Sequence, residues 1–234
     1  MDFAIQFIID VLSLGGAYAL MALGLVLVYG ILKLVNFAYG ELIMVAGYTL
    51  HLIGGSPLPW LVMAAVAVVM AMVAGLATDY VAFRPVRAKS VTAVLITSFA
   101  FSTLLQNAAL LFISPRPRSV PLPEIFSQSV MIAGVPTPMR DIITIVAAVL
   151  LLGLFAFLMQ KTVLGIAMRA ASTNFTMARM LGVPANLIIS SAFAISGLLA
   201  GVVGILWIGR IGTVAPAIGL EPLLIAFIAC VIGG

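Results

Sequence analysis

The chain has 234 residues, of which 64% are hydrophobic and only 8% are charged, and its mean hydropathy is +1.31. A soluble domain carries about 25% charged residues and roughly 45–50% apolar ones, so a chain of this composition cannot present a wettable surface. The composition excludes an ordinary soluble protein. It indicates an all-α, polytopic bundle of transmembrane helices, because a spanning helix satisfies its own backbone hydrogen bonds in lipid.

The formal net charge is +4, and the Lys and Arg residues gather in a few short polar stretches between apolar runs. Such clusters report membrane topology, and we expect no nucleic-acid partner. Cys230 is the only cysteine and His51 the only histidine, which leaves no internal disulfide and no ordinary Cys/His metal site. Residues 1–10 contain no Lys or Arg, so no cleavable signal peptide is predicted.

Apolar runs of about 20 residues, the length that crosses a bilayer, recur along the chain. Five are clear: residues 11–32, 58–77, 91–113, 142–159 and 187–208. A sixth, residues 34–54, contains polar residues and either crosses or re-enters. A seventh, residues 223–234, is too short to cross. We expect one transmembrane domain over residues 1–234, with about six complete spans and an unfinished C-terminal one.

Two loops carry the strongest excess of positive charge. Residues 79–90 hold three Lys or Arg residues against one acid, and residues 161–186 hold three against none. Both loops should therefore be cytoplasmic, and the two spans between them make these assignments consistent. The proline-rich loop 114–141 then lies outside. The N-terminus is also outside if residues 34–54 cross, which the absence of Lys and Arg before Lys33 favours.

Motifs for chemistry are missing from the sequence. There is no G-x-x-x-x-G-K-[ST] loop for nucleotide phosphates. There is also no H-E-x-x-H, no G-x-S-x-G and no clustered carboxylate pair. We therefore predict no catalytic residues, and the chain is not expected to be an enzyme.

A polar segment, residues 36–41, follows the first span directly. A carboxylate facing lipid costs at least a few kcal/mol, so Glu41 should face a protein interface or an aqueous path. Two interpretations are open. Asn36 and Glu41 line a translocation route or its gate, or Asn36 caps a helix and Glu41 lies in an early turn beside the positive end of its dipole.

The span 91–113 carries a polar row. Ser98, Ser102 and Gln106 are spaced by four residues and share one helix face, with Asn107 one position further on. This face either lines a polar pathway or supplies hydrogen bonds between helices. In the span 187–208, Gly197, Gly201 and Gly204 predict close helix packing, within the chain or against a second membrane subunit.

The cytoplasmic loop 161–186 contains a short amphipathic helix. Residues 174–181 have a helical pattern, Gly182 suits a helix C-terminus, and Pro184 cannot continue the helix. Such a helix lies on the lipid head groups or docks a cytoplasmic partner. Both interpretations remain open from the residues alone.

This loop resembles the ATPase-docking loop of ATP-driven importer permeases, which has two small residues, three others and then Gly. Thr176, Met177, Ala178 and Gly182 follow that pattern loosely, with Thr176 where an acid is usual and Met177 where a small residue is usual. Residues 13–24, 36–41 (Asn-Phe-Ala-Tyr-Gly-Glu), 84–87 (Arg-Pro-Val-Arg), 95–107 and 164–170 resemble the branched-chain amino-acid permease family. Members usually continue beyond Gly234, so the chain looks like a C-terminally shortened copy or a fragment.

The resemblance implies a subunit of an importer in a bacterial or archaeal cytoplasmic membrane. Its implied partners are a second homologous permease, two cytoplasmic ATPases and an extracytoplasmic solute-binding protein. ATP and Mg would be held by the partner ATPase, and no cofactor by this chain. The implied ATPase-coupling residues are Arg169, Thr176, Met177, Ala178, Arg179 and Gly182.

Branched-chain amino acids are the expected solutes, with urea or short amides as the alternative within the family. A secondary transporter or channel without an ATPase is a second alternative. It would need ionisable groups inside the spans, for which Glu41 is the one serious candidate. A membrane scaffold or nonfunctional fragment is a third.

Overall fold

The computed structural model describes residues 2–33, 35–87, 89–132 and 134–233. Its helices are α1 (Asp2–Leu32), α2 (Tyr39–Ile53), α3 (Trp60–Ala77), α4 (Val91–Phe112), α5 (Met139–Lys161), α6 (Val163–Thr173), α7 (Phe175–Met180), α8 (Ala185–Ile211) and α9 (Leu220–Gly233), with a π-helical turn η1 (Thr78–Phe83) and a 3-10 turn η2 (Glu124–Phe126). Two short antiparallel pairs join β1 (Arg118–Ser119) to β4 (Thr213–Val214), and β2 (Ser129–Ile132) to β3 (Val135–Pro138). The predicted all-α polytopic bundle is confirmed.

Five helices within the described residues are long and apolar enough to cross a membrane: Ala4–Leu32, Trp60–Phe83, Val91–Phe112, Met139–Lys161 and Ala185–Ile211. They correspond to the five clear apolar runs of the sequence. The expected sixth span is shorter as a helix, because α2 has only 15 residues. At 1.5 Å per residue it extends about 22 Å, less than the roughly 30 Å hydrocarbon core.

The segment around α2 nevertheless joins opposite ends of the bundle. Lys33, at the end of α1, shares a cavity with Arg87 and Arg179. At the other end of α2, the ring nitrogen Nδ1 of His51 lies 2.8 Å from the carbonyl oxygen of Ser119 in the proline-rich loop. Residues 35–38, which precede α2, are not helical. Residues 35–53 therefore run from one end of the bundle to the other, first as non-helical backbone and then as helix, which favours the crossing interpretation.

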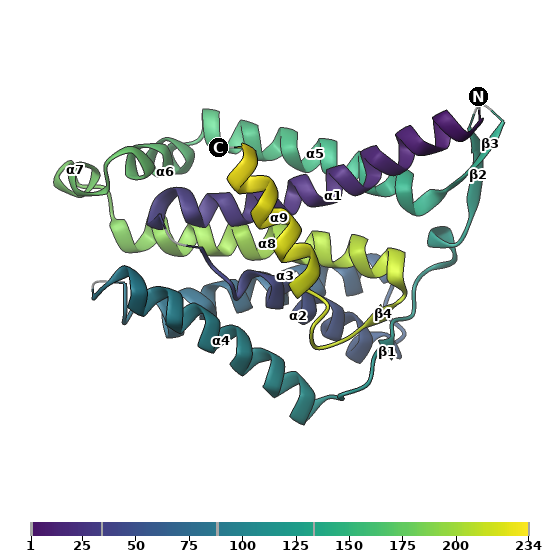
Figure 1. Cartoon of the computed structure of the whole chain (residues 1–234), viewed down its shortest axis with the longest axis horizontal. Helices are drawn as coiled ribbons and strands as arrows, with labels where there is room; N and C mark the ends of the chain where they lie inside the picture. Colours follow the sequence, from purple (N-terminus) through teal and green to yellow (C-terminus); the bar gives the residue numbers. More distant parts are fainter. Residues whose placement is uncertain (1, 34, 88, 133, 234) are drawn as a thin grey trace.

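The two ends of the bundle differ in character (Figure 1). α6, α7 and the starts of α4 and α8 lie at one end, while the N-terminal end of α1 and the β-strands lie at the other. The first end carries both Lys- and Arg-rich loops and is assigned to the cytoplasm. The second end, with the proline-rich loop, is the external end, and the N-terminal end of α1 lies there too.

Helix α8 is the centre of the bundle. In its most apolar stretch of 18 residues, 67% of the residues are buried, whereas only 11% are buried in the corresponding stretch of α5. A Cβ atom added at Gly197 would lie 2.6 Å from the carbonyl oxygen of Ala71 in α3, and one at Gly201 would lie 2.9 Å from Cα of Val68. A Cβ at Gly204 would lie 3.1 Å from the carbonyl oxygen of Ile43 in α2. These three glycines therefore make contacts within the chain, where small residues let backbones approach closely.

Replacing Gly197 with alanine should destabilise the bundle by roughly 1–3 kcal/mol, because the new methyl group meets the backbone of α3. The measurement is the thermal unfolding midpoint of the detergent-solubilised protein. Gly153→Ala in α5 is the matched control, since nothing lies within 4 Å of its added Cβ. The control should be neutral or slightly stabilising, as alanine favours helix by about 1 kcal/mol. Equal shifts in both variants would contradict close α3–α8 packing.

Candidate functional site

A buried polar cluster lies between the start of α2 and the middle of α4. Glu41, in the first turn of α2, is 1% exposed. Its Oε1 accepts hydrogen bonds from Ser102 Oγ at 2.9 Å and Gln106 Nε2 at 2.6 Å. One turn earlier on α4, Ser98 Oγ accepts from the backbone N–H of Phe37 at 2.7 Å. The polar row of α4 thus faces the segment that contains Glu41.

The backbone before α2 is shaped by Asn36. Its side-chain Oδ1 accepts from the N–H of Ala38 at 3.0 Å, and its carbonyl oxygen accepts from the N–H of Tyr39 at 3.2 Å. This local turn brings the chain into α2, where Glu41 lies beside the positive end of the helix dipole. We call Asn36, Glu41, Ser98, Ser102 and Gln106 the α2–α4 polar cluster.

The α2–α4 polar cluster keeps unused hydrogen-bonding capacity. Oε2 of Glu41 and Nδ2 of Asn36 are buried and have no hydrogen-bond partner within the described part of the chain. Buried polar atoms are nearly always paired, so unpaired ones need an explanation such as water, a ligand or a second conformation. The cluster is therefore a candidate binding site for a polar group.

Asn107 does not join this cluster, although its sequence position suggested that it would. Its side chain is exposed and donates to the carbonyl oxygen of Thr103 on its own helix, at 2.8 Å. One further residue rotates the side chain by about 100° around the helix axis. That rotation takes Asn107 away from the face that carries Ser98, Ser102 and Gln106.

Helices α2 and α9 begin next to each other inside the bundle. A Cβ atom added at Gly40 would lie 2.6 Å from the carbonyl oxygen of Gly219, the residue before α9. Both residues are buried, and Leu223 of α9 also lies against Gly40. α2, a short helix whose N-terminal end lies inside the bundle, resembles the discontinuous helices from which transporters build their sites.

The cytoplasmic segment folds into two capped helices. The side chain of Thr162 accepts from the N–H of Gly165 at the start of α6, and that of Asn174 accepts from the N–H of Met177 at the start of α7. Beyond α7, Gly182 has φ +85°, a left-handed conformation that suits glycine. Pro184 follows and α8 begins at once, so only four residues separate α7 from the central helix.

The residues predicted for ATPase coupling occupy different positions in this segment. Met177, Arg179 and Gly182 are exposed, while Ala178 is 4% exposed and packs in the core with Phe83 and Phe193. Thr176 belongs to α7, but its side chain lies outside the part of the chain that the structure describes. Arg169 belongs to α6, where its Nη1 donates to the carbonyl oxygen of Met159 at 2.6 Å. Arg169 therefore holds α6 against the end of α5.

Sequence reasoning missed a buried acid at the cytoplasmic end. Asp79 in η1 is 1% exposed; its Oδ2 accepts from Ser190 Oγ at 2.5 Å, and its Oδ1 lies 3.6 Å from Nη1 of Arg87. Arg87 also donates to the side chain of Asn186. These bonds tie the end of α3 to the start of α8. The sequence feature that could have revealed it is the position of Asp79 among apolar residues at the end of a predicted span.

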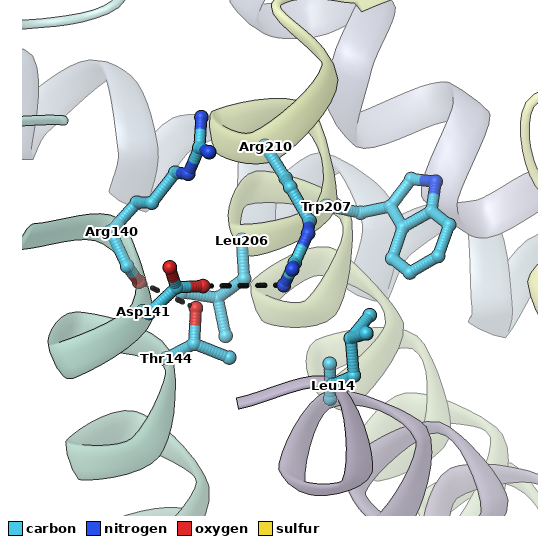
Figure 2. A pocket seen from close by; sticks show the side chains of 8 residues that line it. Leu14, Arg140, Asp141, Thr144, Leu206, Trp207 and Arg210 are labelled. Carbon is cyan, nitrogen blue, oxygen red and sulfur yellow. Dashed lines mark hydrogen bonds and ion pairs between the residues drawn. The ribbon is translucent and has the colours of Figure 1, made fainter. Parts of the chain in front are cut away.

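A second missed cluster joins three helices at the external end, and Figure 2 shows two of its members, Asp141 and Arg210. Asp141 of α5 is 2% exposed and accepts from Ser13 Oγ of α1 at 2.8 Å. The same Oδ1 lies 3.2 Å from Nη1 of Arg210 in the last turn of α8. The adjoining cavity, of about 10 Å³, has room for about one water molecule. We call Ser13, Asp141 and Arg210 the external cluster.

The external cluster could have been anticipated from topology. Asp141 directly precedes one predicted span, and Arg210 follows another by two residues. With the orientation from the charged loops, both positions fall at the external end. Opposite charges at the same depth in neighbouring helices tend to pair, because an isolated charge there is costly.

The fold and these sites define a class: a polytopic membrane protein with a short helix exposed at its cytoplasmic end and polar groups inside its spans. A family profile described as the permease component of the branched-chain amino acid transport system matches residues 7–234. The chain belongs to this family. This family consists of transport permeases, which are not themselves enzymes.

Curated relatives carry matching descriptions. The chain is 32% identical over 243 residues to the high-affinity branched-chain amino acid transport system permease protein BraD of Pseudomonas aeruginosa, covering 98% of this chain and 79% of the relative. It is 34% identical over 237 residues to LivH of Escherichia coli, which has the same description, covering 95% and 76%. A shorter match, 35% over 101 residues, is to the E. coli xylose transport system permease protein XylH. No solved structure matches the chain.

Proposed function

We propose that this chain is the membrane-spanning permease subunit of an ATP-binding-cassette importer in the cytoplasmic membrane of a bacterium or archaeon. We propose branched-chain amino acids as its solutes, in keeping with the names of BraD and LivH. The structural observation that carries the proposal is the position of α7, which is exposed at the positively charged end and separated from α8 by four residues.

The energy source is external to the chain in this proposal. The sequence has no phosphate-binding P-loop, so ATP and Mg would be held by two partner ATPases on the cytoplasmic side. A second homologous permease would complete the pathway, and an extracytoplasmic solute-binding protein would deliver the solute. Urea or short amides are the alternative solutes, since a path lined by hydroxyl and amide groups accepts neutral polar molecules as well.

The ATPase would dock on the exposed side of α7, which includes Met177 and Arg179. The buried side of α7 carries Ala178, which packs near Phe83 and Phe193, two rings with centroids 5.0 Å apart. A movement of α7 therefore pushes directly on the core around α8. Helix α8 has 27 residues and extends about 40 Å, so a tilt at its cytoplasmic end reaches the external cluster.

The α2–α4 polar cluster is proposed to line the pathway or its gate. Among the described residues, Oε2 of Glu41 and Nδ2 of Asn36 have no hydrogen-bond partner, within a bundle that otherwise offers mainly apolar side chains. An amino acid carries an ammonium and a carboxylate group, which need polar partners when they leave water. The free oxygen of Glu41 suits the ammonium group.

Replacing Gly182 with valine should separate ATP hydrolysis from solute uptake. A β-branched residue strongly disfavours φ +85°, so the link between α7 and α8 must change its path, although nothing lies within 4 Å of the added Cβ. In proteoliposomes containing the full transport complex, uptake of leucine should fall at least about tenfold. A tenfold loss corresponds to a weakening of the coupling free energy between hydrolysis and uptake by about 1.4 kcal/mol. Membrane insertion and ATP hydrolysis should persist.

Gly134→Val is the matched control. Gly134 has φ +87° and an equally open surrounding, but it lies in the β2–β3 turn at the external end. It should carry the same local strain without affecting coupling. Undiminished uptake by Gly182→Val would count against the importer assignment and favour a transporter or channel that works without an ATPase.

Glu41→Gln tests the pathway separately. Glutamine keeps an oxygen that can accept from Ser102 and Gln106, but it removes the negative charge. A charged hydrogen bond contributes about 1.5–3 kcal/mol, so leucine uptake should fall about tenfold or more, while the ATPase remains bound. Thr103→Val on the exposed side of α4 is the control, since its hydroxyl bonds only its own helix. Normal uptake by Glu41→Gln would remove Glu41 from the pathway.

A further inference from the structure

A large cavity opens at the cytoplasmic end, where α1 ends and α8 begins. Its volume is about 710 Å³. Lys33, Arg87 and Arg179 supply three positive charges to its wall, and no acidic residue is among the described residues that line it. The three cations come from separate parts of the chain: the end of α1, the loop after η1, and α7.

The charges of this cavity are only partly balanced. Arg87 is paired with Asp79, their nearest atoms being 3.6 Å apart, and it also bonds Asn186. Lys33 and Arg179 form no ion pair with any residue that the structure describes. Two uncompensated cations beside a neutralised pair give the cavity a net positive charge. It therefore favours an anion with several oxygen atoms.

Apart from the three cations and Asn186, the wall of the cavity is apolar. Ile31 and Leu32 come from the end of α1, and Ile189 comes from the first turns of α8. These are the ends of two spanning helices, so the cavity lies at the level of the cytoplasmic membrane surface. An anion that has a hydrocarbon part fits both kinds of wall, whereas a free inorganic ion would use only the cations.

We infer that this cavity binds the phosphodiester head group of an anionic phospholipid from the cytoplasmic leaflet. Basic pockets between helices on the cytoplasmic side are suited to such head groups. The lipid phosphate would lie between Lys33 and Arg179, with its glycerol against Ile31 and Leu32. A lipid held there would connect α7 to α1. The inference does not depend on the identity of the transported solute. Because Lys33 lies outside α7, a change at Lys33 tests the lipid site without altering the side of α7 proposed for the ATPase.

The test is lipid binding by the complete transport complex, reconstituted in nanodiscs that contain phosphatidylglycerol and phosphatidylcholine in equal amounts. Native mass spectrometry reports which lipids remain bound. The unchanged protein should retain phosphatidylglycerol preferentially. Lys33→Gln should weaken that retention about fivefold and Lys33→Gln with Arg179→Gln about 25-fold, since each cation near a membrane surface contributes a similar factor.

Arg84→Gln is the matched control. Arg84 is at the same end of the bundle but lies over the ring of Tyr80, 5.2 Å from its centroid, and does not line the cavity. It should leave retention unchanged. Equal loss in Arg84→Gln would mean that general surface charge attracts the lipid and would overturn the proposal.

Two further results would also overturn it. Millimolar inorganic phosphate should not displace phosphatidylglycerol; displacement would identify a site for free phosphate. If Lys33→Gln left lipid retention intact but released the ATPase, the cavity would be a contact for acidic side chains of a partner protein instead.

Discussion

The close approach of α8 to α3 and α2 is the contact on which the rest of the bundle depends. In lipid there is little hydrophobic force between helices, so association relies on close packing and on hydrogen bonds. Gly197, Gly201 and Gly204 leave no room for a side chain at these crossings. Because α8 is held in this way, its two ends have defined neighbours: α7 at the cytoplasmic end and the external cluster at the other.

Both ends of α8 are also held by bonds to buried acidic residues. Ser190 bonds Asp79 at the cytoplasmic end, and Arg210 pairs with Asp141 at the external end. Removing one member of a buried pair costs about 3–5 kcal/mol, less where a partner is partly exposed, as Arg210 is. These pairs therefore favour one placement of α8, and a transport cycle that tilts this helix must change them. In the proposed importer, the Ser190–Asp79 and Arg210–Asp141 contacts would have to change when α8 tilts.

Much of the fold was predictable because hydropathy and helical spacing are local properties. The five full-length spans and the short helix before Gly182 follow from them, and so does the shared face of Ser98, Ser102 and Gln106. The non-helical stretch before α2 was not predictable, since it depends on Asn36 and on support from α4. Asp141 and Arg210 lie 69 positions apart, and spacing along one helix cannot show which helices meet. Asn107 shows a different limit, since one residue beyond Gln106 the side chain has turned to the exposed side of α4.

The central claim is that α7 faces the cytoplasm, because an ATPase can act on the bundle only from that side. Labelling with a membrane-impermeant maleimide tests it most directly, in a chain with Cys230 replaced by serine. Met177 is 55% exposed on α7, and Gln128 is exposed in the loop at the opposite end. Met177→Cys should react in inside-out vesicles and Gln128→Cys in right-side-out vesicles. Reaction of Met177→Cys from the outside would contradict the account.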